Sequence, residues 1–287
     1  MNENTVMYQI TETSLFMMSF VIVTKQNNVI VVDGGRPADM PLLKEYVGGR
    51  HISAWILTHA HEDHISGFIS EYKKNKLADF DVERIYYNFP PMEIIENRNV
   101  RDYEYFKSEL LETLPSFLEI LPEIKGKTHF TVQGEQIEID EVKIDFLFSY
   151  HEGLTNNLMN DSSLVFKVIT PNTSVLFLGD IGPDAGDVLY FESRDKLKSD
   201  MVQMAHHGGF CCGMEVYAAI EPKVCLWCCR EASYNGENIP KVYYDKEKMK
   251  ALGWMRMYPL SVTRRWMEQL GVKTHYVTKD GTNEIIL

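Results

Sequence analysis

Apolar residues recur along the chain in short runs that are separated by polar turns, a pattern typical of β-strands. Some runs, such as residues 137–149, alternate apolar and polar positions, which predicts strands with one buried face. Two pairs of runs enclose short polar turns and predict hairpins, at 163–178 and at 272–287. The predicted strands cover residues 14–23, 28–32, 52–57, 82–89, 137–149, 163–169, 175–178, 201–205, 223–229, 272–278 and 284–287.

Helical spacing of apolar residues predicts helices between many of these strands. The longest such segment contains Pro115, which predicts a break into two helices because proline lacks a backbone N–H donor. The predicted helices cover residues 41–46, 65–74, 96–121, 214–220, 245–251 and 261–270. No repeat, low-complexity tract or linker interrupts this alternation. We therefore predict one domain over residues 1–287, with a helical insertion around 92–128.

The most distinctive polar stretch lies between a predicted strand and a predicted helix, where α/β folds often place functional loops. It reads His-Ala-His-Glu-Asp-His at residues 59–64. His59 and His61 are two positions apart, so an extended backbone points both side chains to the same side. Asp63 and His64 lie at the helix start and reach back to that place. Converging imidazoles and carboxylates suit two divalent ions, whereas the alternative, a polar surface turn, rarely holds so many histidines.

Residues with metal-binding or acid–base side chains also occur where other predicted strands end. His151, Asp180 and the adjacent pair His206 and His207 each lie just beyond the last apolar residues of such a strand. Strand ends within one sheet system cluster in space. We therefore predict that these side chains join residues 59–64 in a single site.

Asp33 follows the predicted strand 28–32 and precedes Gly34 and Gly35. Aspartate and glycine both suit a tight turn, and a turn alone explains the pattern. The alternative is that Asp33 accepts a hydrogen bond from a metal-binding histidine and so orients its ring. The sequence leaves both interpretations open.

Composition narrows the classes of function without choosing one. The chain has 287 residues, 45% of them hydrophobic, and a net charge of -12. This charge disfavours an extended nucleic-acid track, yet it allows a small phosphate-bearing substrate held by metal ions. Five cysteines and no recognisable secretory signal favour a reducing cytoplasm. The apolar run 15–23 is too short to span a membrane, so no membrane partner is expected.

The motifs resemble those of the metallo-β-lactamase superfamily over nearly the whole chain. Residues 59–64 match its H-x-H-x-D-H motif, and residues 31–35 are similar to its early strand-and-turn signature. The later half more closely resembles the hydrolase domain of competence proteins of the DNA-uptake channel family, of which this chain would be a free-standing relative. That second resemblance is carried by Asn156-Asn157, Ser163-Leu164-Val165, Gly179-Asp180, His206-His207-Gly208 and Lys279-Asp280-Gly281-Thr282.

The resemblance implies an α+β fold, a four-layer αββα sandwich with two mixed β-sheets face to face and helices outside. It implies two divalent metal ions along one edge, with zinc expected and manganese or iron also suited to nitrogen and oxygen ligands. The implied ligands are His59, His61 and His151 for one ion, Asp63, His64 and His206 for the other, and Asp180 as a bridge. His207 is the alternative to His206.

The same resemblance implies how the site would act. Asp63 is expected to orient the attacking water as well as to bind metal, and His207 or Tyr258 to protonate the leaving group. Competence-type relatives often have a His-Pro pair where this chain has Tyr258-Pro259, so their nuclease activity does not carry over directly. Cys211 and Cys212 follow the paired histidines closely and either pack in the core or line the site.

We therefore predict a metal-dependent hydrolase with a small-molecule or phosphoester substrate, first of all a phosphodiester. A lactone, thioester or β-lactam hydrolase using the same centre is the alternative. A di-iron redox protein is a third interpretation, disfavoured because no flavin or other electron-donor segment is visible. A non-catalytic binding protein is a fourth, disfavoured because the ligand set is complete. The fold cannot choose the substrate.

Overall fold

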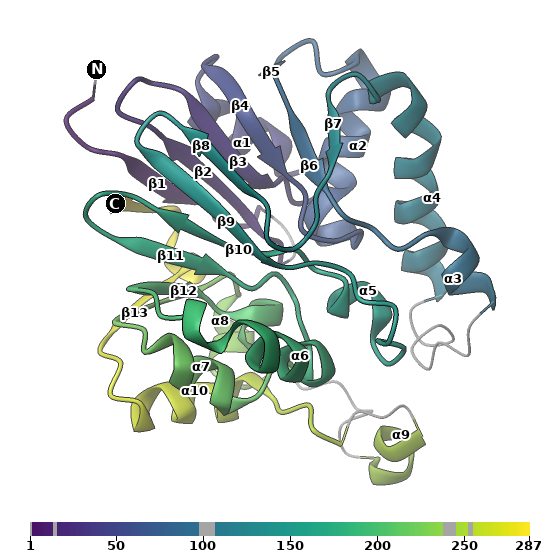
Figure 1. Cartoon of the computed structure of the whole chain (residues 1–287), viewed down its shortest axis with the longest axis vertical. Helices are drawn as coiled ribbons and strands as arrows, with labels where there is room; N and C mark the ends of the chain where they lie inside the picture. Colours follow the sequence, from purple (N-terminus) through teal and green to yellow (C-terminus); the bar gives the residue numbers. More distant parts are fainter. Residues whose placement is uncertain (1, 14–15, 98–106, 238–244, 252–254) are drawn as a thin grey trace.

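A computed structural model of the chain describes residues 2–13, 16–97, 107–237, 245–251 and 255–287 (Figure 1). Its strands form two mixed sheets, one of eight strands and one of seven. The sheets pack face to face and helices lie on the outer faces. The predicted four-layer αββα sandwich of the α+β class is confirmed.

The eight-stranded sheet contains both ends of the chain. Its strand order is β15-β1-β2-β3-β4-β6-β7, with β5 paired to β4. Neighbours from β15 to β3 are antiparallel, whereas those from β3 to β7 are parallel. The strands are β1 (Val6–Gln9), β2 (Ser19–Val23), β3 (Val29–Asp33), β4 (His51–Ile56), β5 (Asp81–Val82), β6 (Ile85–Tyr87), β7 (Thr128–Phe130) and β15 (Asn283–Ile286).

The seven-stranded sheet is built from the middle and later parts of the chain. Its strand order is β14-β13-β12-β11-β10-β9-β8, antiparallel from β8 to β11 and parallel from β11 to β14. The strands are β8 (Gln136–Ile139), β9 (Val142–Phe148), β10 (Val165–Ile169), β11 (Ser174–Phe177), β12 (Met201–Gln203), β13 (Val224–Trp227) and β14 (Thr274–Val277).

Three apolar cores hold the layers together. The central one joins the inner faces of the two sheets and includes Phe20, Phe166 and Phe177, all fully buried. The outer cores pack α1, α2 and α4 on the first sheet, and α6, α7 and α10 on the second. The helices are α1 (Met40–Val47), α2 (Glu62–Asn75), α3 (Met92–Asn97), α4 (Lys107–Ile124), α5 (Leu158–Asp161), α6 (Pro183–Ser193), α7 (Met214–Ile220), α8 (Glu231–Tyr234), α9 (Lys246–Ala251) and α10 (Leu260–Gln269).

The helical insertion differs from its prediction at Pro115. We predicted a break there, but α4 runs through Pro115 and Pro122. Its residues Leu114 and Phe117 are fully buried in the core that α4 shares with α2. Packing of this face keeps the helix continuous despite the missing N–H groups. Part of the predicted segment, residues 98–106, lies outside the described residues.

Two strand predictions were wrong in their connections. Residues 137–149 were predicted as one strand, but Asp140 adopts a left-handed conformation (φ 55°) and turns the chain, so β8 and β9 pair as a hairpin. Residues 272–287 were predicted as a hairpin, but β14 and β15 belong to different sheets. Alternation of apolar residues predicts a strand but not its partner.

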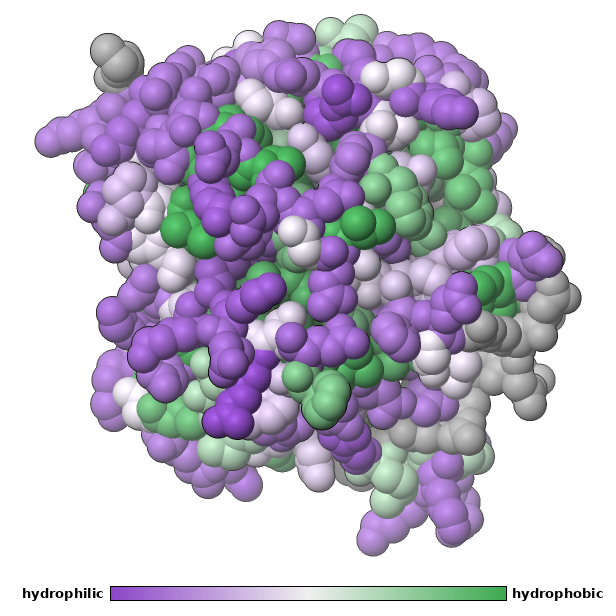
Figure 2. Space-filling view, in the orientation of Figure 1, coloured by the Kyte–Doolittle hydropathy of each residue, from purple (hydrophilic) through white to green (hydrophobic). Residues whose placement is uncertain are grey.

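Several elements had no clear sequence pattern. Strands β1 and β7 and helices α5, α6 and α8 were not predicted. The confirmed α1 and α2 flank β4, and α2 begins within the histidine-rich corner. No helix within the described parts of the chain is long and apolar enough to cross a membrane. Hydrophilic residues cover most of the face in Figure 2, with apolar side chains in scattered patches.

Helix α2 lies close to the turn after β3 because residue 67 is glycine. A Cβ at Gly67 would lie 2.7 Å from the Gly34 carbonyl oxygen and 2.9 Å from that of Arg36. We expect Gly67→Ala to lower the free energy of unfolding by about 1–3 kcal/mol, although alanine is normally the better helix former. Gly126→Ala is the control, since a Cβ at Gly126 meets nothing within 4 Å. Urea unfolding that finds the Gly67 variant as stable as wild type would contradict this packing.

Candidate metal centre

The histidine-rich stretch lies at the predicted strand-to-helix corner. Strand β4 ends at Ile56, and α2 begins at Glu62 with His61 as its extended N-terminal flanking residue. Asp63 and His64 therefore occupy the first turn of the helix, and His59 lies on the loop before it. All three side chains are buried. The corner itself brings these groups together, as predicted.

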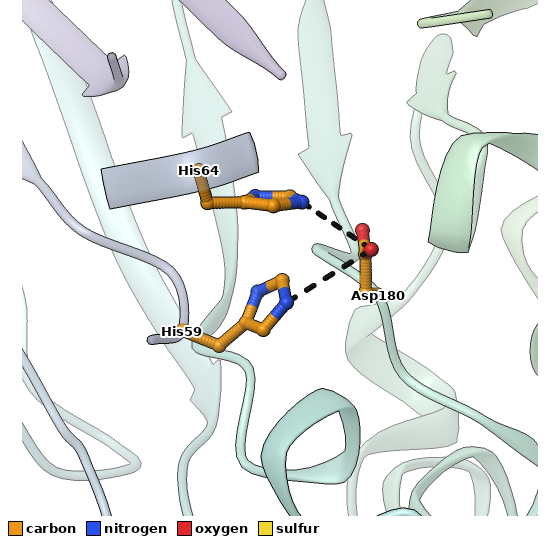
Figure 3. A group of neighbouring side chains, drawn as sticks. All are labelled: His59, His64 and Asp180. Atoms are coloured by element: carbon orange, nitrogen blue, oxygen red, sulfur yellow. Dashed lines mark ion pairs between the residues drawn. The ribbon is translucent and has the colours of Figure 1, made fainter. Parts of the chain in front are cut away.

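Asp180 is the centre of the cluster (Figure 3). It follows β11, the strand that ends at Phe177, and its side chain is only 2% exposed. One carboxylate oxygen, Oδ2, lies 3.3 Å from His64 Nε2, 3.9 Å from His59 Nε2 and 3.5 Å from His207 Nε2. One buried oxygen thus faces three imidazole nitrogens from two distant parts of the chain.

Two overlapping groups of side chains have the spacing of metal ligands. One contains His59, His64 and Asp180, and the other contains Asp63, His64 and His207. In the second, Asp63 Oδ2 lies 3.0 Å from His207 Nε2 and 4.0 Å from His64 Nε2. The ligand atoms within each group lie within 4.8 Å of one another, which suits imidazole and carboxylate ligands around divalent ions.

Hydrogen bonds on the outer sides of two histidine rings determine which nitrogen faces the cluster. His64 Nδ1 lies 2.7 Å from Asp33 Oδ2, and His207 Nδ1 lies 2.8 Å from the carbonyl oxygen of Cys228. Each Nδ1 therefore carries the proton and donates it outward. In the neutral ring, each Nε2 then has its lone pair towards the cluster, as a metal ligand requires.

The inner atoms have no other use within the described residues. His64 Nε2, His207 Nε2 and Asp180 Oδ1 are buried, and none makes a hydrogen bond there. Burying a polar atom without a hydrogen-bond partner costs stability, so a group of such atoms indicates a place where the protein binds an ion. The donor set and these atoms fit divalent metal ions at this place.

Asp33 fits both of its interpretations: it lies in a tight turn, and its carboxylate contacts His64. Its φ of 54° places it in the left-handed region of a tight turn. Its carboxylate also accepts hydrogen bonds from the Thr58 N–H and Thr58 hydroxyl, both at 2.7 Å, besides contacting His64. The side chain thus joins the end of β3 to the loop that carries His59 and orients the His64 ring.

The pKa values of the buried histidines are shifted in opposite directions. Burial lowers the pKa of His59 well below its ordinary value and that of His61 to about 4. Burial also lowers the pKa of His64, but Asp180, Asp33 and Asp63 outweigh it, so this pKa lies well above its ordinary value. His207 is raised for the same reason, by Asp180 and Asp63 against burial.

Metal binding should therefore release protons. The raised pKa values of His64 and His207 favour the protonated form of both rings in the metal-free protein. A metal ion needs the unprotonated nitrogen, so binding displaces protons from these rings and affinity falls as pH falls. Calorimetry of zinc binding at pH 7 in buffers of different ionisation enthalpy measures this release. Affinity that is independent of pH, with no proton release, would show that these rings are not ligands.

The remaining predicted site residues take different positions. His61 Nδ1 lies 3.1 Å from His59 Nε2, at the margin of the cluster. His151 is exposed and accepts a hydrogen bond from the Gly153 N–H at 3.1 Å, and it belongs to neither described ligand group. Tyr258 is 43% exposed and packs on Trp266, with ring centroids 5.5 Å apart.

His206 and His207 lie in positions that favour His207, the alternative ligand, over His206. His207, expected as a proton donor, lies among the ligand atoms, whereas His206, the expected ligand, lies outside both groups with Nδ1 3.4 Å from the Phe210 carbonyl oxygen. Both residues are left-handed, with φ of 50° and 56°. Such a conformation costs about 1–3 kcal/mol in a non-glycine residue, and here it turns the second imidazole, not the first, towards Asp180.

The sequence also missed groups around the centre. Phe16 is 43% exposed, and its ring centroid lies 5.1 Å from that of His207. The guanidinium of Arg36 lies 5.8 Å from the centre of the Phe16 ring and pairs with Glu62. Phe16 lay within a predicted strand, so only its tertiary position reveals an apolar wall beside a metal-site histidine. The Cys228 carbonyl carries no side-chain signal at all.

The chain was then compared with known proteins. A family model of the metallo-beta-lactamase superfamily matches residues 16–209, more than half of the chain. The chain belongs to this superfamily. Members of the superfamily are mostly metal-dependent hydrolases and typically bind divalent metals. A search among curated proteins found no match.

Several proteins of known structure share the fold of this chain. The metallo-beta-lactamase fold protein YhfI from Bacillus subtilis is 12% identical with a TM-score of 0.52, covering 98% of this chain and 99% of that one. Igni18, a metallo hydrolase from Ignicoccus hospitalis, is 13% identical with a TM-score of 0.53, covering 98% of both chains. The CmlA beta-hydroxylase E377D mutant is 12% identical with a TM-score of 0.51, covering all of this chain and 54% of that one. Identities this low establish the fold alone.

Proposed function

We propose that this superfamily member is a hydrolase that binds two divalent metal ions with Asp180 as the bridging ligand. The observation that carries the proposal is the place of Asp180 Oδ2, within 3.9 Å of three imidazole nitrogens. A carboxylate surrounded by imidazoles at these distances is the arrangement that two neighbouring ions need. Zinc is the first expectation, and manganese or iron would also suit the nitrogen and oxygen donors.

We propose the division of ligands that the family motif implies, with His207 in place of His206, and note that His64 also lies beside His59 and Asp180. His59 and His61 would hold one ion, with Asp180 shared. Asp63, His64 and His207 would hold the other. His151, predicted as a third histidine for the first ion, would have to move from its exposed position to reach it.

Bound ions would polarise the carbonyl or phosphoryl oxygen of the substrate and would lower the pKa of a water molecule. The chain's own residues would supply orientation and proton transfer. Asp63, held beside His207, would direct the attacking water. The leaving group would take a proton from Tyr258 or from His206, which flank the same loop because the Phe210 N–H donates to the Tyr258 carbonyl oxygen at 2.6 Å.

A phosphodiester is the substrate class that we propose first. Support comes from the competence-type sequence motifs Asn156-Asn157, His206-His207-Gly208 and Lys279-Asp280-Gly281-Thr282. The net charge of -12 favours a small substrate over a long nucleic-acid track. The exposed Phe16 ring beside His207 favours the second candidate, an ester, lactone, thioester or β-lactam with an apolar acyl group.

The experiment is a substrate panel on zinc-loaded and manganese-loaded protein. It contains bis(p-nitrophenyl) phosphate, an aliphatic lactone, a thioester and a chromogenic β-lactam. We expect metal-dependent turnover of the phosphodiester, and Phe16→Ala should leave this turnover within about threefold of wild type. Turnover of an acyl substrate alone, with a raised KM in Phe16→Ala, would select the second candidate. Loaded protein that turns over none of the panel would contradict the proposal.

We further propose that residues 1–287 act as one domain in the cytoplasm. The pairing of β15 with β1 and the five buried, free cysteines support this. One cooperative unfolding transition and recovery in the cytoplasmic fraction are the expected results. Two separate transitions, or recovery as an exported protein, would contradict it.

A further inference from the structure

The loop that carries His207 is held in a strained shape. Besides His206 and His207, Phe210 is also left-handed, with φ of 57°. Non-glycine residues in this region persist only where surrounding contacts hold them. The contacts that hold residues 206–210 therefore decide where His207 Nε2 lies.

Both ends of this loop are tied to the residues that flank Asp180. The His206 N–H donates to the Gly179 carbonyl oxygen at 3.1 Å, and the Cys212 N–H donates to that of Ile181 at 3.0 Å. Helix α6 also packs tightly here, since a Cβ at Gly186 would lie 2.6 Å from Cys212 Cβ. The loop ends are thus bonded to the residues on both sides of Asp180. A shift of the loop ends would therefore change the distance between His207 and Asp180.

A single hydroxyl group joins these two ends. Tyr217 of α7 is fully buried. Its oxygen accepts a hydrogen bond from the Ala205 N–H at 3.3 Å, and its O–H donates to Cys211 Sγ at 3.4 Å. Cys211 Sγ in turn lies 3.7 Å from the hydroxyl of Thr263 on α10. Ala205 and Cys211 are the residues immediately before and after the strained segment.

We infer that the Tyr217 hydroxyl is a positioning group for the metal centre, which holds the His207 loop at the spacing that the Asp63–His64–His207 ion requires. The inference rests on the proposed two-metal function. Tyr217 acts through the loop, and His59 and His61 come from the opposite sheet, on a segment that the loop does not carry. Loss of the hydroxyl should therefore weaken the binding of the ion at Asp63, His64 and His207 and leave the binding of the other ion unchanged.

The test is a titration of metal-free full-length protein with zinc against a chromogenic chelator. Wild type should bind two ions per chain. Tyr217→Phe should bind one ion with wild-type affinity and the other about 10- to 100-fold more weakly, the usual effect of losing a group that orients a ligand. Tyr72→Phe is the matched control, because it removes a hydroxyl that bonds Glu123 far from the loop; it should bind both ions as wild type does.

Other outcomes separate the two claims. Wild type that binds no zinc overturns the proposed function and this inference with it. Wild type that binds two ions, with Tyr217→Phe unchanged or weakened equally at both, overturns only the role of Tyr217. If Tyr217→Phe does not fold, Cys211→Ala and Cys211→Ser replace it. Selective loss of one ion in the alanine variant, restored in the serine variant that keeps an acceptor, supports the inference, and equal binding by both overturns it.

Discussion

Asp180→Ala is expected to remove metal binding and turnover together. Asp180 Oδ2 is the one described oxygen that faces His59, His64 and His207 at once, at 3.3–3.9 Å. Its loss would take a ligand from both proposed ions and would leave Asp63 as the remaining carboxylate beside His64 and His207. Metal chemistry supplies several kcal/mol of transition-state stabilisation, so turnover should fall by about 10³-fold or more.

The control for Asp180→Ala is Asp187→Ala. Asp187 lies on the following helix, α6, is half exposed, and pairs with Arg256 away from the cluster. Its variant should keep both ions and wild-type turnover. Metal content after dialysis and initial rates on the substrate that wild type prefers measure the difference. An Asp180→Ala protein that holds two ions with wild-type affinity would show that this carboxylate is no bridge.

His207→Ala and His206→Ala form the second decisive pair. His207 Nε2 lies 3.0 Å from Asp63 and 3.5 Å from Asp180, whereas His206 lies outside both described ligand groups. We expect His207→Ala to lose one ion per chain and about 10²-fold in turnover or more. His206→Ala should keep both ions, and any loss of turnover should come from proton transfer.

His206 and His207 are neighbours on one strained loop, so the two substitutions should disturb the backbone to a similar degree. Metal stoichiometry separates them more sharply than activity, because a lost proton donor also slows turnover. The reverse result, with one ion lost only in His206→Ala, would restore the assignment that the sequence motif suggested. It would also require the loop to differ from the conformation described here.

Local patterns in the sequence predicted many of the strands and helices and the clustering of candidate ligands, whereas the layered αββα fold was predicted from the family resemblance. The corner 59–64 was predicted because a buried strand, a polar turn and a helix follow one another within a few residues. Asp180 was predicted because it follows an apolar strand directly. Both predictions depend on short-range periodicity, which a single sequence carries well.

Long-range choices were not predictable in the same way. Which of two adjacent histidines faces Asp180 depends on two left-handed residues, and no side-chain pattern encodes that turn. The last two strands enter different sheets because pairing partners, not alternation, place a strand. Phe16 reaches His207 only through folding of distant segments, and Tyr217 acts through a buried hydroxyl that resembles any core tyrosine in the sequence.

The most direct test of the account is an anomalous difference map from crystals of the zinc-loaded protein. Two peaks should lie on either side of Asp180, one beside His59 and His61 and the other beside Asp63, His64 and His207, each about 2.0–2.2 Å from its ligand atoms. A map with no peak at the cluster, or with a single peak that Asp180 does not contact, would contradict the two-metal centre.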